Sequence, residues 1–287
     1  MKVAVVGAGR VGTAMAVLLG RAGHVVVAVS GRGPTRDRAA RYLPDAAFLE
    51  PAAAAEAGEL VLIGVPDDLI APTAVDLAGA NALRSGQYVA HLSGARGLDV
   101  LEPVRAAGAR RLGIHPLQTF PDVGHALDRI PGCVVAVSAD DEDGFFVAER
   151  IADDVLGSPF RLTDDLRPLY HAAAVFASNY LVATTAVAAR LFSAAGLVDP
   201  DAAMAPLQRA TLDNLRDLGP AKALTGPAAR GDAGTIRRNL EALDAHAPDA
   251  VAAYVALARI ALDLAAAAGS LDPGRRSGVE AVLERWS

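Results

Sequence analysis

Apolar and polar positions divide the chain into two regions of different periodicity. In residues 1–163, short apolar runs rich in β-branched residues alternate with segments whose apolar positions repeat at helical spacing. Such runs predict buried strands, and such segments predict amphipathic helices. Strands are predicted at residues 2–6, 25–29, 47–49, 60–65, 87–92, 111–114, 133–137 and 159–162, and helices at 13–22, 35–42, 51–58, 69–80, 101–107 and 142–156. The alternation predicts an α/β fold with a doubly wound parallel sheet.

From about residue 164 to the end, only helical periodicity remains. Breaks rich in Gly and Pro interrupt it at residues 196–200, 219–220, 226–234, 248 and 269–273. This spacing predicts an all-α domain of about five helices. The chain is therefore predicted to contain two domains, residues 1–163 and 164–287.

A glycine-rich turn follows the first predicted strand and reads GAGRVG at residues 7–12. A GxGxxG sequence that follows a strand, opens a helix and leads to a second strand is the dinucleotide-binding fingerprint in its required context. Gly7 permits the tight turn, Gly9 the close approach of a pyrophosphate, and Gly12 the packing of helix on strand. Arg10 and Val11 stand at the helix N-terminus, whose free N–H groups and dipole attract phosphate. Residues 1–163 are thus predicted to be a Rossmann domain.

The end of the second predicted strand indicates which dinucleotide binds. NAD enzymes of this type place an acidic residue there for the ribose hydroxyls, but here the sequence is Val29-Ser30-Gly31-Arg32. Ser30 can hydrogen-bond a 2′-phosphate and Arg32 can pair with it through two N–H groups. We therefore predict NADP(H) as the cofactor, although the arginines of this region could equally form a solvated loop.

Composition and charge exclude several classes of protein. A net charge of −6 provides no basic field for nucleic acid, and Cys133 is the only cysteine. The six histidines show no metal-ligand spacing, so no metal is expected. The apolar stretches 172–189 and 251–268 contain polar residues and are predicted to be buried helices of a soluble protein, not membrane spans. Met1 leads directly into the first strand, so we expect a cytoplasmic protein, and the apolar helical domain favours a homodimer.

Candidate residues for chemistry follow the predicted strands, because ligands of open α/β sheets bind outside the carboxyl ends of the strands. Val65 and Pro66 would line the adenosine or ribose side, and Ser93 would lie near the nicotinamide. His115 ends a strand and could polarise a carbonyl or exchange a proton during hydride transfer. The alternative is a histidine that caps a turn. Gln118, in the polar loop that follows, is a candidate for substrate binding.

Two further clusters lie in the predicted helical domain. At about 100° per residue, His171 and Ser178 share one helix face, with Asn179 beside them. These side chains could close over the nicotinamide and bind substrate, or they could hydrogen-bond other helices. The second cluster is a loop at residues 224–232. Its Thr225 and Arg230 could bind a substrate carboxylate, whereas Asp232 could cap the helix that begins near Thr235.

Several motifs together resemble a bacterial family that has a Rossmann-like domain and a helical C-terminal domain of uncharacterised function. They are GAGRVGTAMA at 7–16, HLSGA at 91–95, GIHPLQTF at 113–120, YHAAAVFASNYLVA at 170–183 and LTGPAARGD at 224–232. Members of that family are described as NADP-dependent oxidoreductases, and some resemble a ketopantoate reductase. More distantly, the layout is similar to pyrroline-5-carboxylate reductases, 3-hydroxyacid dehydrogenases and prephenate dehydrogenases. In the last of these, a Ser and a His-Pro at strand ends form the active site, which Ser93 and His115-Pro116 match.

The resemblance implies an NADPH-dependent reductase of a small 2-oxo acid. His115 would then polarise the substrate oxygen, Ser93, His171 and Asn179 would orient it, and Arg230 would hold its carboxylate. One position departs from the family pattern: ketopantoate reductases place a Lys four residues before the Asn that Asn179 matches, but Val175 stands there. Two alternatives remain open for this reason. One is a dehydrogenase of the prephenate type, and the other is a protein that binds NADP(H) as a sensor without turnover.

Overall fold

A computed structural model describes residues 1–286. It divides into two compact units, with the boundary between Asn179 and Tyr180. The boundary predicted from the change of periodicity was residue 163, at the end of the last strand. The difference arises because the helix that follows this strand packs back on the first unit, where the side chain of its Arg167 is fully buried.

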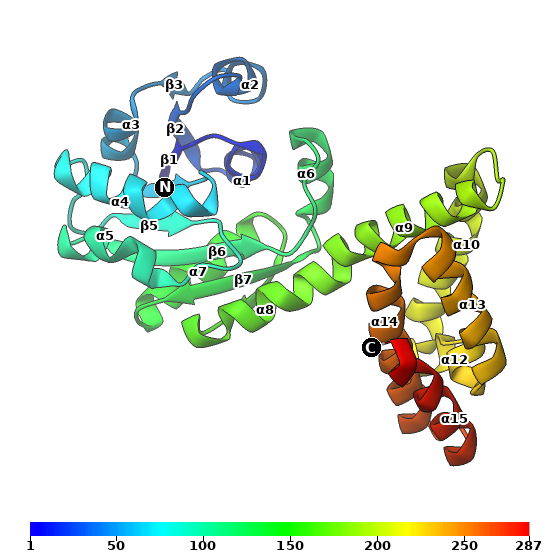
Figure 1. Ribbon diagram of the computed structural model, residues 1–287. Coiled ribbons are helices and arrows are strands. Elements are labelled where there is room, and N and C mark those ends of the chain that lie inside the picture. Colours follow the sequence, from blue (N-terminus) through cyan, green and yellow to red (C-terminus); the bar gives the residue numbers. More distant parts are fainter. Residues whose placement is uncertain (287) are drawn as a thin grey trace. The chain divides into compact units, whose positions relative to one another are not determined.

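The first unit contains an eight-stranded sheet in the order β3-β2-β1-β4-β5-β6-β7-β8 (Figure 1). The strands are β1 Lys2–Val6, β2 Val25–Ser30, β3 Ala47–Phe48, β4 Leu60–Ile63, β5 Tyr88–His91, β6 Arg110–Pro116, β7 Val134–Ala139 and β8 Ser158–Arg161. The sheet confirms the predicted α/β class, and every predicted strand is present within three residues of its predicted ends. β1 lies between β2 and β4, where the strand order changes direction, and this switch point is where open α/β sheets bind their ligands.

One strand pair corrects the prediction of an all-parallel sheet. β7 runs antiparallel to β6, and Pro116 pairs with Val135. The connection between them was predicted as a loop but contains the helix α6, Val123–Arg129, which Asp122 caps by accepting a hydrogen bond from the His125 N–H. α6 packs against α1 rather than carrying the chain back to the opposite end of the sheet, so the next strand must return antiparallel.

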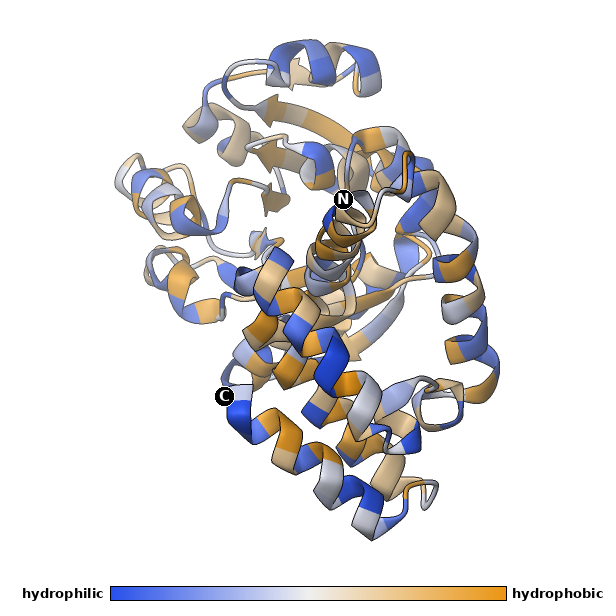
Figure 2. Ribbon diagram, turned by 45° about the vertical axis from the view of Figure 1, so that its right-hand side comes forward, coloured by the Kyte–Doolittle hydropathy of each residue, from blue (hydrophilic) through white to orange (hydrophobic). Residues whose placement is uncertain are grey.

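The helices of the first unit cover the sheet and supply its core. They are α1 Arg10–Arg21, α2 Thr35–Tyr42, α3 Pro51–Ala57, α4 Ile70–Gly79, α5 Glu102–Ala106, α6, α7 Glu142–Asp154 and α8 Arg167–Ala174. Met15 and Leu19 of α1 are fully buried against strand residues such as Leu62 and Ile114. Figure 2 shows the strands as mainly hydrophobic and the helices as mixed. This is the pattern of a sheet that is covered on both faces.

The second unit is entirely helical within its described residues. Its helices are α9 Tyr180–Ala194, α10 Pro200–Leu218, α11 Pro220–Ala223, α12 Pro227–Arg230, α13 Ala233–His246, α14 Val251–Ala267 and α15 Pro273–Leu283. The prediction of an all-α region is confirmed, but it missed α11 and α12, which have four residues each and no room for a periodic pattern. The core of this unit lies between α13, α14 and α15, at Ile236, Leu240, Leu262 and Val279.

The prediction of burial is wrong for the apolar stretch at 172–189, whereas the stretch at 251–268 buries one face, at Val255, Ala258, Leu262 and Ala265. Two helical runs, Asp164–Ala194 and Pro248–Ala267, are long and apolar enough to cross a membrane by length and composition, and 0% and 22% of their most apolar windows are buried. α9 has no buried residue, and Val182 on it is 68% exposed. Periodicity recognised apolar helices, but whether another element of the same chain covers them depends on the packing of the whole unit.

Candidate functional site

The glycine-rich turn forms the floor of a cavity at the carboxyl ends of β1, β2 and β4. Gly7 has φ +79°, a conformation that L side chains rarely adopt, and its N–H donates to the Ser30 carbonyl. A Cβ at Gly7 would come within 2.4 Å of Val65 Cγ1, and one at Gly64 within 2.7 Å of the Gly7 carbonyl oxygen. α1 begins directly after Gly9, and no side chain caps its first N–H groups. The N–H groups of Gly7, Ala8 and Gly9 are bonded to the Ser30 and Gly7 carbonyls, so the groups left for a pyrophosphate are the uncapped first N–H groups of α1.

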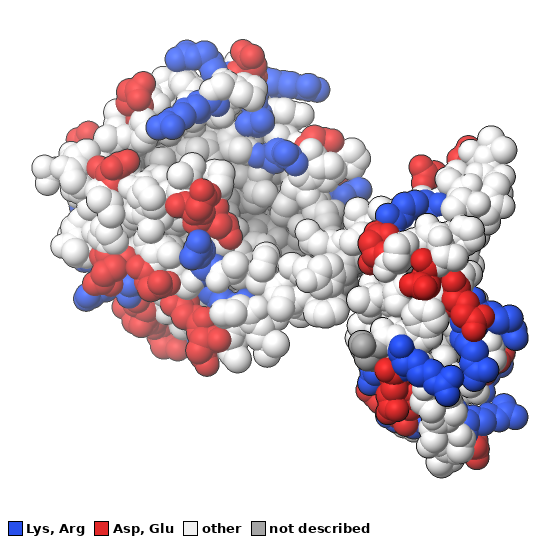
Figure 3. Space-filling model, viewed as in Figure 1, with Lys and Arg blue, Asp and Glu red and all other residues white. Residues whose placement is uncertain are grey.

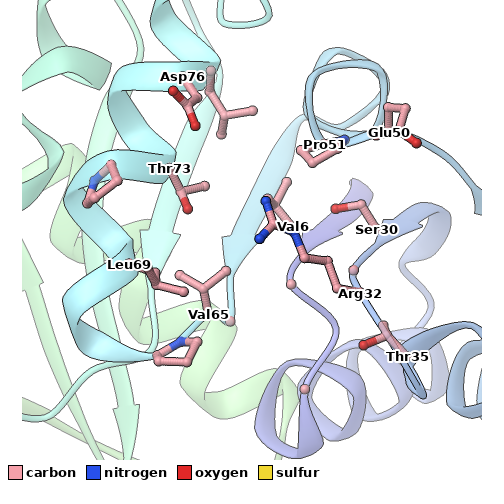
Figure 4. Close-up of a pocket in the computed structure, with 17 residues that line it drawn as sticks. Val6, Ser30, Arg32, Thr35, Glu50, Pro51, Val65, Leu69, Thr73 and Asp76 are labelled. Carbon is pink, nitrogen blue, oxygen red and sulfur yellow. The ribbon is translucent and has the colours of Figure 1, made fainter.

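This cavity has a volume of about 510 Å³. Figure 4 shows Ser30 and Arg32 on one side and Val65, Leu69 and Thr73 on the other. Of the nine residues predicted to bind the cofactor, it is lined by Gly7, Gly9, Ser30, Arg32, Val65 and Pro66. Gly12 lies behind the turn, where a Cβ would be 3.1 Å from Val5 Cγ1, so this glycine serves helix packing as predicted. Arg10 and Val11 do not line the cavity.

The Ser30 hydroxyl has no partner. Ser30 is 1% exposed, and among residues 1–286 its Oγ makes no hydrogen bond, although it lies beside the cavity. A buried hydroxyl without a partner costs about 1–3 kcal/mol, so such a group in a cleft is an indication that a ligand completes it. The residues present therefore fit a dinucleotide: the uncapped N-terminus of α1 for the pyrophosphate, and Ser30 with Arg32 for the adenosine ribose and its substituents.

Two findings in this cavity were not visible in the sequence. Glu50, which precedes α3, lines the same cavity as Ser30 and Arg32, so a carboxylate does stand near the ribose end although none ends β2. Near the cavity, Arg38 donates from its Nη1 to the Ala8 carbonyl at 3.0 Å and so supports the glycine turn. Basic side chains gather over α2 at the top of the first unit (Figure 3).

Arg10 connects the glycine turn to the loop after β6. Its Nη1 donates to the Phe120 carbonyl at 3.0 Å. Gln118 lies in the same loop, where its side-chain oxygen accepts the Thr119 N–H. These contacts place the loop beside the N-terminus of α1. They do not by themselves give Gln118 a ligand.

Ser93 follows β5, at the predicted place, but its hydroxyl is fully used. It donates to Asp67 Oδ2 at 2.7 Å and accepts the N–H groups of Ala95 and Arg96. One donated and two accepted bonds exhaust a hydroxyl group. Asp67 follows the neighbouring strand β4, and its carboxylate accepts the Ser93 hydroxyl. Because Asp67 is exposed, this carboxylate remains able to meet a substrate.

His115 stands at the end of β6, in contact with two elements. Its Nδ1 lies 3.0 Å from the Tyr170 hydroxyl of α8, and the two rings meet edge to face. Its imidazole lies on Gly94, where a Cβ would be 2.8–3.0 Å from three ring atoms. Burial, followed by the charge of Arg167 and by His171, lowers the pKa of His115 to about 4. His115 is therefore neutral at physiological pH and has one N–H to donate.

Arg167 is a buried cation beneath this site. Its Nη1 donates to the Ser93 carbonyl at 2.9 Å, and its Nε and Nη2 donate to Ser138 Oγ on β7. Its closest carboxylate, Asp164, is 3.5 Å away. Burial lowers the pKa of Arg167. Burial and the charge of Arg167 lower the pKa of His91, on β5, to about 3. Arg167 thus bonds to the strand ends that carry the site, and its charge adds to burial in lowering the pKa of the neighbouring histidines.

The predicted helix face of His171, Ser178 and Asn179 is interrupted. Val175–Asn179 is a π-helical turn, whose wider winding rotates the residues that follow it relative to those before it. His171 lies close enough to His115 to lower its pKa. The predicted shared face assumed regular α-helical winding, which the π-helical turn at Val175–Asn179 does not keep.

Thr225 and Arg230 belong to the second unit. The loop that carries them is held by Gly231, whose φ is +67°, and by Arg275, which donates to the Arg230 carbonyl. Asp232 caps α13 by accepting the Thr235 N–H, so its predicted capping role is confirmed.

Sequence reasoning missed Asp67, Arg167 and Tyr170. Asp67 follows a predicted strand and could have been found by the same rule that selected Ser93. Tyr170 lies in a motif that was recognised, but no periodicity shows that its hydroxyl reaches β6. Nothing in the sequence around Arg167 distinguishes it from a solvated arginine, so it could not be selected.

Comparisons with known proteins agree with this architecture. Residues 1–116 match the family described as a Rossmann-like domain, and residues 133–261 match a domain of unknown function, DUF2520. The chain is 32% identical over 190 residues to the NAD(P)+ glycerol-3-phosphate dehydrogenase of Rhizobium etli. That match covers 56% of this chain and 52% of the relative, so the chain spans about half the length of this curated relative.

Two solved structures share the fold along most of the chain. One is a Bacteroides fragilis protein provisionally described as an NADP oxidoreductase, with TM-score 0.77, 24% identity, and coverage of 91% of this chain and 98% of that one. The other is an imine reductase from Myxococcus stipitatus in complex with NADP+, with TM-score 0.65, 18% identity, and coverage of 100% and 99%. At these identities the likeness concerns the fold. The chain thus joins a segment that matches Rossmann-like domains to a segment that matches DUF2520 domains.

Proposed function

We propose that this protein is an NADP(H)-dependent oxidoreductase that reduces a small 2-oxo acid by hydride transfer. The observation that carries the proposal is the hydroxyl of Ser30, which is buried and has no partner within residues 1–286, beside a cavity that is also lined by Arg32 and by Gly7 and Gly9 of the glycine turn. The relatives support the reaction class, since the names of three of them include NADP or NAD(P)+. Arg32 supports NADP over NAD, because its planar guanidinium suits a phosphate monoester.

The bound nicotinamide supplies the hydride. His115, neutral and at the carboxyl end of β6, holds an N–H that can donate to the oxygen of a carbonyl and stabilise the charge that develops there. Burial and the charge of Arg167 together lower the pKa of this imidazole, and Arg167 also donates to the Ser93 carbonyl in the turn against which the ring lies. With Val175 in place of the family's lysine, His115 is the proton donor of the proposed reaction.

A second candidate substrate is a cationic imine. Asp67 favours it, because this exposed carboxylate lies near His115 and would repel an acid but attract an iminium ion. For a 2-oxo acid, we propose that Gln118 and Ser178, both of the first unit, lie around the substrate.

The decisive experiment measures NADPH and NADH oxidation by purified protein with three panels: 2-oxo acids including ketopantoate, cyclic imines, and, in the reverse direction with NADP+, prephenate and hydroxy acids. Turnover of a 2-oxo acid with NADPH supports the proposal, and turnover of imines alone transfers it to the second candidate. Oxidation of prephenate would indicate a dehydrogenase. Tight NADPH binding without turnover in any panel would refute an enzyme and favour a sensor.

We also propose that the protein is a cytoplasmic homodimer that pairs through the helical domain. The support is the uncovered apolar surface of α9 and α10, including Leu181, Val182, Leu207 and Leu212, which are 45–68% exposed. A second copy suits this surface better than a bilayer, because the same helix carries Arg190, which forms an exposed ion pair with Asp249 at 2.7 Å.

Light scattering during size-exclusion chromatography tests the dimer. The wild type should elute with twice the mass of one chain, and Val182→Glu should elute as a monomer. Val25→Glu is the matched control, because Val25 is 61% exposed but lies in the first unit, and it should remain dimeric. A monomeric wild type that is soluble without detergent would contradict this proposal.

A further inference from the structure

The hydroxyl of Tyr170 has a single partner shown by the structure, and it is the imidazole of His115. Tyr170 is the fourth residue of α8, which returns across the sheet after β8. Its Oη lies 3.0 Å from His115 Nδ1, with ring centroids 5.6 Å apart and planes at 88°. Tyr170 therefore approaches the ring from the side opposite to Nε2, which leaves Nε2 as the nitrogen able to face a substrate.

The direction of this hydrogen bond follows from the chemistry of the two groups. A phenol is a good donor and a poor acceptor, whereas the free nitrogen of a neutral imidazole is a good acceptor. Burial raises the pKa of Tyr170 to about 12, so its O–H is retained, and the pKa of His115 of about 4 leaves the imidazole neutral. The Tyr170 O–H then donates to Nδ1, and the single imidazole proton resides on Nε2.

We propose that Tyr170 is the positioning residue that holds His115 in the Nε2–H tautomer and refills its proton during turnover. The inference rests on the proposed function, because it assigns the origin of the proton that the reduction consumes. As hydride reaches the substrate carbon, the C=O π bond breaks, and the oxygen takes the proton from Nε2. The Tyr170 proton moves to Nδ1 in the same step, so the imidazole stays neutral and a phenolate remains. After the product leaves, a proton from water reaches Nε2 and the Nδ1 proton returns to the phenolate, which restores the Nε2–H tautomer.

The positive charge of Arg167 stabilises the transient phenolate of Tyr170. It lies three residues before Tyr170 on α8, on the same face, and is fully buried, so it cannot touch a substrate. Its charge acts on Tyr170 in the direction that favours the phenolate, against the effect of burial. The other titratable groups near the pair are Asp67, His91, Cys133 and His171. Arg167 is the only permanent cation in this set.

The first test needs no substrate. Nitrogen-15 NMR of the histidine side chains near neutral pH, with His115→Gln to assign the signal, reports which ring nitrogen of His115 carries the proton. We expect Nε2–H in the wild type and a mixture of both tautomers in Tyr170→Phe. Tyr42→Phe, on α2, is the matched control and should leave the His115 signal unchanged. A wild-type His115 protonated on Nδ1, or a Tyr170→Phe signal identical to the wild type, would overturn the proposal.

The second test uses whichever substrate the panels identify. Tyr170→Phe should lower kcat by about 100-fold, the lower range for the loss of a positioned proton donor, with KM and the NADPH dissociation constant unchanged. A plot of rate against deuterium fraction should be curved in the wild type, where two protons move, and linear in Tyr170→Phe. An unchanged kcat would refute the proton relay but not the role of Tyr170 in fixing the tautomer of His115. A protein without turnover in any panel refutes the proposed function, while the NMR result still decides the role of Tyr170.

Discussion

Replacing Ser30 with alanine should affect stability and cofactor affinity in opposite ways. The Ser30 hydroxyl has no hydrogen bond within residues 1–286, so its removal breaks none. Since an unpaired buried hydroxyl costs about 1–3 kcal/mol, the free energy of unfolding of the apo protein should stay the same or rise by about 1 kcal/mol. The bound phosphate or ribose would lose a charge-assisted bond of about 1.5–3 kcal/mol, which corresponds to roughly 10- to 100-fold weaker NADPH binding.

Urea denaturation of the apo protein and fluorescence titration with NADPH and NADH measure both quantities. A contact to the 2′-phosphate weakens NADPH alone, and a contact to the ribose weakens both nucleotides. Ser138→Ala is the matched control, because Ser138 is also buried but donates to the Leu162 carbonyl and accepts from Arg167, so it should destabilise the protein by about 1–3 kcal/mol. The reasoning is refuted if Ser30→Ala destabilises the apo protein by more than about 1 kcal/mol and binds NADPH as tightly as before.

Three further outcomes are expected. Arg32→Ala should weaken NADPH binding by at least about tenfold and leave NADH binding nearly unchanged. Glu50→Gln should mainly weaken NADH binding. Equal effects of either variant on both nucleotides would contradict these assignments. Gly94→Ala should push the His115 ring from its position and lower kcat by at least about tenfold, whereas Gly79→Ala, where a Cβ meets nothing within 4 Å, should leave kcat unchanged. The unfolding free energy should fall by about a few kcal/mol as pH drops from 6.5 toward 4, because His91 and His115 bind protons in the unfolded chain but not in the folded one. Urea denaturation at each pH measures this fall, and His115→Gln should show a shallower decline. An equally steep decline in His115→Gln would disprove the effect.

The sequence by itself determined the elements and the cofactor-binding turn. Periodicity and Gly or Pro breaks are local properties, and they located every strand of the sheet. The role of Gly7 also follows locally, since its positive φ belongs to the turn itself. Ser30 and Arg32 could be selected because a parallel sheet always presents its strand ends at one edge. Asp232 could be recognised as a helix cap from its place before Thr235.

Tertiary structure decided which of these residues meet. The antiparallel return of β7, the carboxylate of Glu50 in the cavity and the π-helical turn before Tyr180 each depend on how separate segments pack. The same holds for the polar site, where Arg167 bonds to β7 and to a carbonyl 74 residues away. Hydrogen bonds form between groups that are close in space, whereas the periodicity of the sequence indicates only which face of an element is apolar. The sequence therefore identified His115 as a candidate, whereas only the fold showed that Tyr170 and Arg167 lie near its ring.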